Sequence, residues 1–188
     1  PEWEDSAIKN GVADQARAVL EDMPVNVFKI GMLGSVEIIA SIAEVISDYP
    51  NIPLVLDPVL ASGRGDELAN DEMVMAMREL LLPQATIITP NSLEARRLAQ
   101  DDDDDDDDDN PDLSQCAGRL LSLGCEYVLI TGTHENTSQV INSLYGSAGV
   151  VRSDKWQRLT GSYHGSGCTL ASAIAAGLAN GLSIAEGV

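Results

Sequence analysis

The sequence has few aromatic side chains and few cysteines. Aromatic residues make up 4% of the 188 residues and include a single Phe, so the core must be built from aliphatic side chains. The cysteines are odd in number, and none belongs to a Cys-x-x-Cys pair: Cys116, Cys125 and Cys168. This usage argues against a disulfide framework or a structural zinc site. It favours a reducing compartment, and we expect a cytoplasmic protein.

Basic residues are also scarce. Eleven Lys and Arg face 30 Asp and Glu, for a formal net charge of −19. Such a balance offers no basic patch for the phosphates of nucleic acid or for an anionic membrane surface. No apolar stretch reaches membrane-spanning length, and no signal peptide is visible. We therefore expect neither nucleic acid nor a membrane as a partner.

Nine of the acidic residues form one uninterrupted run, Asp101–Asp109. Successive like charges repel one another and disfavour a helix. We interpret 101–109 as a solvated acidic loop inserted into a single domain that spans residues 1–188. A cation-binding role is the alternative for this run, and we expect any catalytic metal elsewhere.

Apolar patterning predicts strands that alternate with helices. Hydrophobic residues make up 44% of the chain, and the length suits one α/β domain with a real core. The predicted strands are 25–33, 53–58, 85–89 and 127–131, followed by a hairpin of 140–145 and 150–155. The predicted helices are 7–22, 35–46, 73–82, 90–98, 113–123 and 166–180. This alternation favours an α/β fold with a mostly parallel central sheet and right-handed crossovers.

In such sheets, ligands bind beyond the carboxyl ends of the strands. Residues at those ends are therefore the first candidates for a site: Met32, Gly34, Asp57, Asn91, Glu94, Thr131 and Gly132. They are far apart in the sequence, yet the topology lets them converge at one edge of the sheet.

Gly165-Ser166-Gly167-Cys168-Thr169 opens an Ala-rich helix. Glycines on either side of one small residue let consecutive backbone N–H groups point into one concavity, and a helix N-terminus favours an anion there. A phosphoryl group in transfer needs such a cradle. Cys168 lies in the first helical turn, where we expect a lowered thiol pKa, and a thiolate there can accept the proton of an attacking hydroxyl.

Each candidate also has a purely structural explanation. The glycine-rich turn alone is better explained by tight packing of a helix on a strand. Asn91 and Glu94 could form a capping box, and Asp57 could be a turn residue before proline. Met32 and Val59 could be core packing, and Thr131 and Gly132 could be a strand-to-turn transition. The residues taken one by one leave these alternatives open.

Seven segments in order resemble the phosphomethylpyrimidine kinases of thiamine biosynthesis, a branch of the ribokinase-like superfamily. The matching segments run from the first strand to the last helix: Lys29-Ile30-Gly31-Met32-Leu33, Leu56-Asp57-Pro58-Val59, Leu81-Leu82-Pro83-Gln84-Ala85, Thr89-Pro90-Asn91-Ser92-Leu93-Glu94-Ala95, Leu121-Ser122-Leu123-Gly124-Cys125, Thr131-Gly132-Thr133-His134 and His164-Gly165-Ser166-Gly167-Cys168-Thr169-Leu170. The resemblance implies a three-layer α/β/α, ribokinase-like fold.

The resemblance also implies a reaction. ATP, with Mg²⁺, would phosphorylate 4-amino-5-hydroxymethyl-2-methylpyrimidine and then its monophosphate. It implies that Cys168 is the catalytic base, in place of the superfamily's usual Asp, and that Gly165, Ser166 and Gly167 form the anion hole. Asp57, Asn91 and Glu94 would face the metal. Thr131 and Gly132 would contact the ATP phosphates, and Met32 and Val59 the pyrimidine. Family members commonly pair as dimers, so a homodimer is a possible assembly.

The chain also departs from the family pattern. The family usually has Gly-Gly-His where this chain has Gly132-Thr133-His134, and often Thr where Ser166 stands. The family's opening strand with its Gly-rich segment does not precede Pro1, and its C-terminal helices are missing, so we expect a fragment of the kinase domain. A pyridoxal-type kinase of the same superfamily and a non-catalytic nucleotide-binding fragment are the alternative functions.

Overall fold

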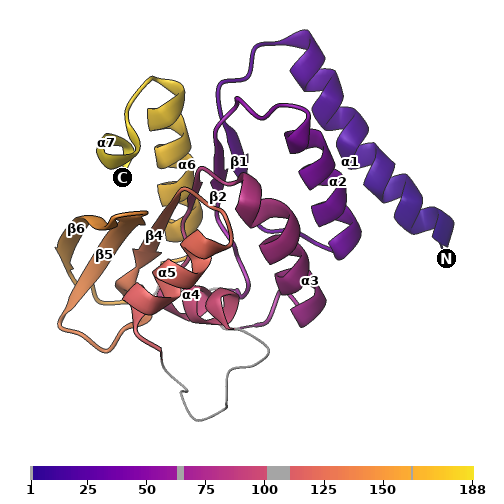
Figure 1. Cartoon of the computed structure of the whole chain (residues 1–188). Helices are drawn as coiled ribbons and strands as arrows, with labels where there is room; N and C mark the ends of the chain where they lie inside the picture. Colours follow the sequence, from indigo (N-terminus) through magenta and orange to yellow (C-terminus); the bar gives the residue numbers. More distant parts are fainter. Residues whose placement is uncertain (1, 63–65, 101–110, 162) are drawn as a thin grey trace.

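The computed structural model describes residues 2–62, 66–100, 111–161 and 163–188 (Figure 1). Its strands are β1 (Phe28–Ile30), β2 (Leu54–Leu56), β3 (Ile87–Ile88), β4 (Tyr127–Thr131), β5 (Gln139–Gly146) and β6 (Gly149–Gln157). Its α-helices are α1 (Glu2–Asp22), α2 (Val36–Ser47), α3 (Asp71–Ala76), α4 (Ser92–Ala99), α5 (Leu113–Ser122), α6 (Ser166–Ala179) and α7 (Ile184–Gly187). The predicted alternation of strands and helices is confirmed.

All six strands form one sheet in chain order. β1 to β4 are parallel, and β5 and β6 add an antiparallel hairpin at the edge next to β4. The mostly parallel sheet is therefore confirmed. Because β1 to β4 run the same way, their carboxyl ends meet at one edge, where α/β sheets bind ligands.

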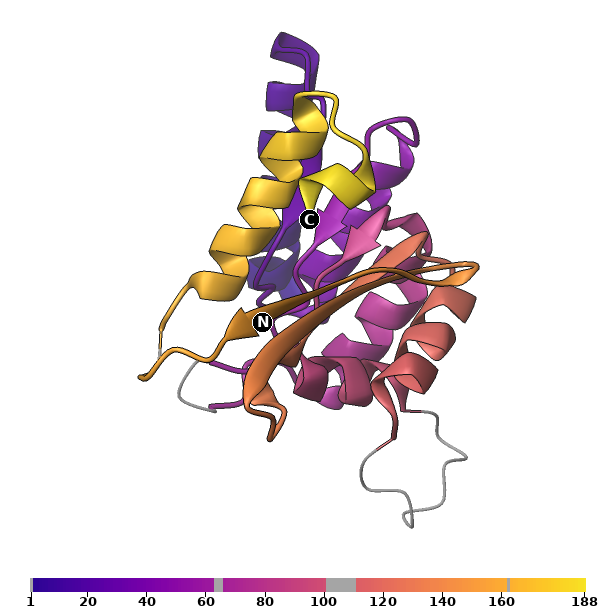
Figure 2. The same cartoon turned by 90° about the vertical axis from the view of Figure 1, so that its left-hand side faces the viewer.

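Helices cover both faces of the sheet (Figures 1 and 2). On one face, α2, α3, α4 and α5 enclose the larger core, to which Val128 and Ile130 of β4 belong. On the other face, α6 packs against a smaller core that contains Leu129 and Leu144. Successive residues of β4 thus point to opposite layers, as strand geometry requires. The three-layer α/β/α prediction is confirmed.

Several predicted elements have other bounds in the structure. The strand expected over 85–89 covers only Ile87–Ile88, and the helix expected over 7–22 begins at Glu2. The strand expected over 25–33 is confined to Phe28–Ile30. The helix expected over 73–82 begins earlier, as α3, then widens into a π-helical turn at Met77–Leu81 and ends in a 3₁₀ turn at Leu82–Gln84. Pro83 lies in this last turn, and because proline lacks an N–H it cannot continue the regular helical hydrogen bonding.

The start of α2 follows the predicted capping pattern. The Ser35 side chain accepts a hydrogen bond from the backbone N–H of Ile38 at 3.3 Å. Capping of this kind typically contributes about 1 kcal/mol. It fixes the turn that leads from β1 into α2.

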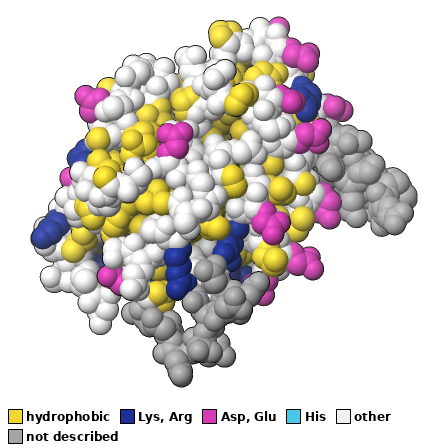
Figure 3. All heavy atoms as spheres, in the orientation of Figure 1, with side chains coloured by type: hydrophobic (Ala, Val, Ile, Leu, Met, Phe, Trp, Pro, Cys, Tyr) yellow, Lys and Arg dark blue, Asp and Glu magenta, His cyan; other side chains and the backbone are white. Residues whose placement is uncertain are grey.

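The acidic run Asp101–Asp109 lies outside the described residues. The helices that flank it in sequence, α4 and α5, pack against each other in the larger core. On the face in Figure 3, acidic side chains are scattered among exposed hydrophobic ones. In the described part of the chain, no helix combines the length and the apolar character needed to cross a membrane.

Candidate functional site

Asp57 lies at the centre of the site, directly after β2. Its backbone N–H donates to the carbonyl of Ile30 at 2.9 Å, which ties the ends of β1 and β2 together. The carboxylate is buried, and its Oδ2 has no hydrogen-bond partner among the described residues. Lys29 Nζ lies 3.5 Å from Oδ2, so an ion pair balances the buried charge. A turn residue before proline would not need such burial, so Asp57 has the environment of a functional carboxylate.

Cys168 approaches Asp57 from the opposite layer. It lies in the first turn of α6, and its thiol interacts with the Asp57 carboxylate. This hydrogen bond raises the pKa of the Cys168 thiol, and partial burial and repulsion by Asp57 and Glu94 add to the effect, while Lys29 opposes it. The predicted lowering of the thiol pKa is therefore wrong. The helix N-terminus is present, but a carboxylate beside the sulfur outweighs it.

The glycine-rich turn before Cys168 has the expected backbone geometry. Gly165 caps α6 in the left-handed region, with φ +79°, which L side chains rarely adopt. A Cβ added at Gly165 or Gly167 would meet no atom within 4 Å. The turn is thus open to solvent, and the first N–H groups of α6 have no acceptor within the helix. An anion at Gly165, Ser166 and Gly167 stays a prediction.

Asn91 and Glu94 form a capping box at the start of α4. The Asn91 side chain accepts from the N–H groups of Leu93 and Glu94 at 2.9 and 3.0 Å. Glu94 accepts from Asn91 N at 2.9 Å through Oε2 and from Leu60 N at 3.2 Å through Oε1. The structural explanation of these two residues is therefore confirmed. The Glu94 carboxylate can still bind a further group, because each of its oxygens can accept a second hydrogen bond.

Glu94 is also electrostatically coupled to the rest of the site. Burial raises its pKa to about 7, against the backbone hydrogen bonds that lower it, and the charge of Asp57 adds to the increase. Both Asp57 and Glu94 influence Cys168. Asp57, Glu94 and Cys168 thus lie close enough to influence one another.

Thr131 and Gly132 extend the same edge. Thr131 ends β4, forms a parallel bridge with Asn91 and donates its N–H to Pro90 O at 3.0 Å. Gly132 is buried, and its N–H donates to Asn142 Oδ1 at 3.3 Å. The two residues lie beside Asn91, where phosphates could reach them, and their contact with ATP stays a prediction.

Gly132 has no room for a side chain. A Cβ there would overlap the backbone carbonyl oxygen of Ile141. We expect Gly132→Ala to destabilise the fold by about 3 kcal/mol, because β5 backbone would have to move. Urea unfolding measures the loss. Gly118→Ala is the matched control, since a Cβ at Gly118 meets nothing within 4 Å and alanine favours the helix. Equal stability of the two variants would contradict the predicted clash.

Met32 and Val59 follow β1 and β2 at this edge. Met32 is 66% exposed, so its interpretation as core packing is wrong. Val59 is half-buried, and its N–H donates to Asp57 O at 2.9 Å in a tight turn. Both residues are accessible to a ligand at least in part, and their contact with a pyrimidine stays a prediction.

The donor set at this edge is compatible with Mg²⁺. Asp57 presents a buried carboxylate oxygen without a hydrogen-bond partner, and Glu94 lies close enough to repel it. Within the described ranges, no three Asp, Glu, His or Cys side chains form a group that could hold a metal on its own. Mg²⁺ usually binds proteins through one or two carboxylates and completes its shell with water and phosphate oxygens. The two carboxylates fit this pattern.

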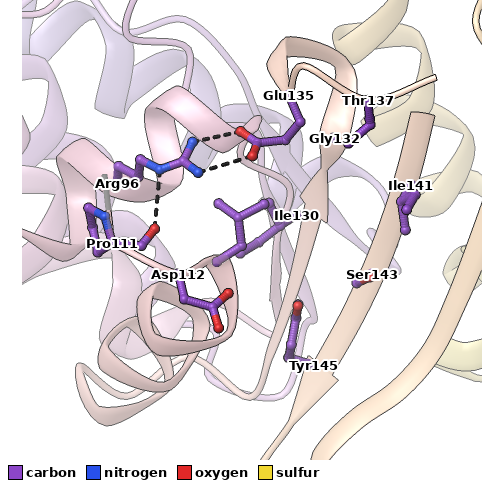
Figure 4. Close-up of a pocket in the computed structure, with 11 residues that line it drawn as sticks. Arg96, Pro111, Asp112, Ile130, Gly132, Glu135, Thr137, Ile141, Ser143 and Tyr145 are labelled. Carbon is purple, nitrogen blue, oxygen red and sulfur yellow. Dashed lines mark hydrogen bonds and ion pairs between the residues drawn. The ribbon is translucent and has the colours of Figure 1, made fainter. Parts of the chain in front are cut away.

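A separate cavity of about 420 Å³ lies on the face of the sheet opposite α6 (Figure 4). Arg96 of α4 closes one side and holds Glu135 with two hydrogen bonds of 2.7 and 3.1 Å. Ile130 and Tyr145 line the wall formed by the sheet. Of the residues predicted from the sequence, only Gly132 borders this cavity.

The Arg96–Glu135 pair predicts a pH effect on stability. Its hydrogen bonds lower the pKa of Glu135 below the ordinary 4.5. The pair therefore stabilises the fold above that value, and the contribution disappears as the pH falls through the lowered pKa. We expect Glu135→Gln to lose about 2 kcal/mol at neutral pH and much less at an acidic pH below the lowered pKa. Chemical denaturation at both pH values tests this, and a loss that does not change with pH would contradict it.

Sequence reasoning assigned no role to Lys29 and missed the cavity beside Arg96. A signal for Lys29 was present, because a lysine within an apolar strand needs a buried anionic partner. No comparable signal marked the cavity. Arg96 and Glu135 are 39 residues apart, and only the packing of α4 against the turn after β4 brings them together.

Comparison with known proteins identifies relatives of this chain. The sequence profile of phosphomethylpyrimidine kinase matches residues 6–188. The thiamine biosynthesis bifunctional protein ThiED of Geobacter sulfurreducens is 37% identical over 177 residues, covering 94% of this chain and 35% of that protein. The chain thus spans about a third of that relative's length.

Solved structures share the fold. The phosphomethylpyrimidine kinase of Clostridium difficile superposes with a TM-score of 0.77 at 34% identity, covering 96% of this chain and 71% of that one. Bacillus subtilis pyridoxal kinase, solved as an ADP complex, gives a TM-score of 0.81 at 31% identity, with 95% and 66% covered. With its ribokinase-like fold and its ordered motifs, the chain belongs to the phosphomethylpyrimidine kinase family.

Proposed function

We propose that the protein transfers the γ-phosphoryl group of ATP to the hydroxymethyl group of 4-amino-5-hydroxymethyl-2-methylpyrimidine, and then phosphorylates the resulting monophosphate. The observation that carries this proposal is the meeting of Cys168, Asp57 and Glu94 at the N-terminus of α6. A nucleophile-activating group, acidic metal-facing groups and an anion-binding turn are the parts that phosphoryl transfer requires. Membership of a kinase family supports the same reaction.

In this proposal the glycine-rich turn and the thiol act on the two reacting groups. The first N–H groups of α6, from Gly165 to Gly167, receive the oxygens of the transferring phosphoryl group. Because the pKa of Cys168 is raised, its thiol must first give up its proton to solvent. The ionised sulfur then accepts the proton of the attacking hydroxyl while the new O–P bond forms and the bond to ADP breaks. Lys29 is the neighbour that favours the ionised sulfur.

The remaining edge residues position the co-substrate and the acceptor. Mg²⁺, when bound, would neutralise phosphate charge, with Asp57 and Glu94 facing it largely through water and Asn91 orienting Glu94. Thr131 and Gly132 contact the ATP phosphates beside Asn91. Met32 and Val59 contact the pyrimidine.

A pyridoxal-type kinase is the second candidate. The similarity of the fold to the Bacillus pyridoxal kinase favours it, and the cluster around Cys168 suits either hydroxymethyl acceptor. A non-catalytic nucleotide-binding protein is the third.

An ADP-release assay on the full-length gene product separates these functions. We expect ADP formation that depends on hydroxymethylpyrimidine, continues with the monophosphate and exceeds the rate without acceptor. Turnover of pyridoxal alone would replace our proposal with the second candidate. Binding of ATP without turnover of either acceptor would favour the non-catalytic one.

A further inference from the structure

We infer that Lys29 is a positioning residue of this site, whose ammonium holds the Asp57 carboxylate beside Cys168. The inference rests on the proposed phosphoryl transfer and adds a residue to it. Lys29 belongs to β1, where it pairs in register with Val55 of β2.

Lys29 and Asp57 form a largely desolvated pair. The Lys29 side chain is 24% exposed and that of Asp57 is 6% exposed, with 3.5 Å between Nζ and Oδ2. A buried charge is stable only with a partner. Lys29 is the cation paired with Oδ2, an oxygen that has no hydrogen-bond partner among the described residues.

Charge explains why a cation is needed at this point. Asp57, Glu94 and Cys168 are all negative when ionised, and they lie close enough to influence one another. Such groups repel strongly where water is excluded. Lys29 opposes this repulsion, so its removal would let the Asp57 carboxylate move away from the sulfur. Small displacements of reacting groups are costly for turnover.

Gly31 provides the space that the ammonium occupies. A Cβ at Gly31 would lie 2.7 Å from Lys29 Nζ. The backbone of Gly31 is outside the left-handed region, so alanine is acceptable there apart from this contact. Gly118 of α5 differs, because a Cβ there would meet nothing within 4 Å.

Four variants of the full-length protein test the inference, with hydroxymethylpyrimidine and ATP as substrates. We expect Gly31→Ala, which moves the ammonium without removing it, to lower kcat about tenfold, and Lys29→Met to lower it about 100-fold. KM for the pyrimidine should change less than about threefold in both. Lys29→Arg should recover much of the turnover, and Gly118→Ala should match the wild type.

Thermal unfolding separates positioning from folding. Gly31→Ala should unfold at the wild-type temperature, so its lower kcat cannot come from lost folded protein. Wild-type kcat in both Gly31→Ala and Lys29→Met would overturn the inference and leave the proposed function intact. A wild-type protein that turns over neither pyrimidine nor pyridoxal would overturn the proposed function, and this inference with it.

Discussion

Cys168→Ala should lower kcat for the pyrimidine about 1,000-fold and leave nucleotide affinity nearly unchanged. The substitution removes the sulfur that we propose as the base. It keeps the backbone N–H groups at the start of α6, and alanine is favoured within a helix. Cys168 is exposed, so its removal costs little packing. Steady-state turnover and calorimetric titration with an ATP analogue measure the two effects.

Cys116→Ala is the control for loss of a cysteine as such. Cys116 is buried in α5 within the larger core, where burial raises its pKa and keeps the thiol neutral. We expect this variant to lose some stability while keeping its turnover per folded molecule. Full turnover in Cys168→Ala would show that the base assignment is wrong.

Asp57→Asn should lower kcat about 100-fold and raise the Mg²⁺ concentration needed for half-maximal rate. The amide has nearly the same shape, but it removes the charge that faces both Lys29 and the proposed metal. Breaking a buried ion pair also costs about 3 kcal/mol of stability. Rates over a Mg²⁺ series, together with urea unfolding, report both losses.

Asp66→Asn is the matched control for Asp57→Asn. Asp66 is exposed in the loop after β2, where its carboxylate accepts a hydrogen bond from Ser62 Oγ at 3.0 Å. This variant should change neither the Mg²⁺ dependence nor the rate. If Asp57→Asn showed the same Mg²⁺ dependence as Asp66→Asn, Asp57 would have no role toward the metal.

Much of the fold could be predicted because local patterns and packing agree. The strand at 127–131 and the hairpin that follows were predicted closely, since apolar runs bounded by turn residues admit few other structures. The helix over 73–82 was predicted less well. Its π-helical turn at Met77–Leu81 depends on how this segment packs, which periodicity does not reveal.

The site was partly predictable for a similar reason. Parallel strands place their carboxyl ends at one edge, so the meeting of Asp57 and Glu94 followed from topology. The pKa of Cys168 did not follow. The sequence shows that Cys168 begins a helix, but only the packing of α6 against β1 and β2 shows that a carboxylate lies beside the sulfur.

A crystal structure with a non-hydrolysable ATP analogue and hydroxymethylpyrimidine tests the central claim most directly. We predict that the hydroxymethyl oxygen lies within hydrogen-bonding distance of Cys168 Sγ. The terminal phosphate should lie against the N–H groups of Gly165 to Gly167, with the metal on the side of Asp57 and Glu94. Binding of the pyrimidine in the cavity beside Arg96, away from the thiol, would contradict the account.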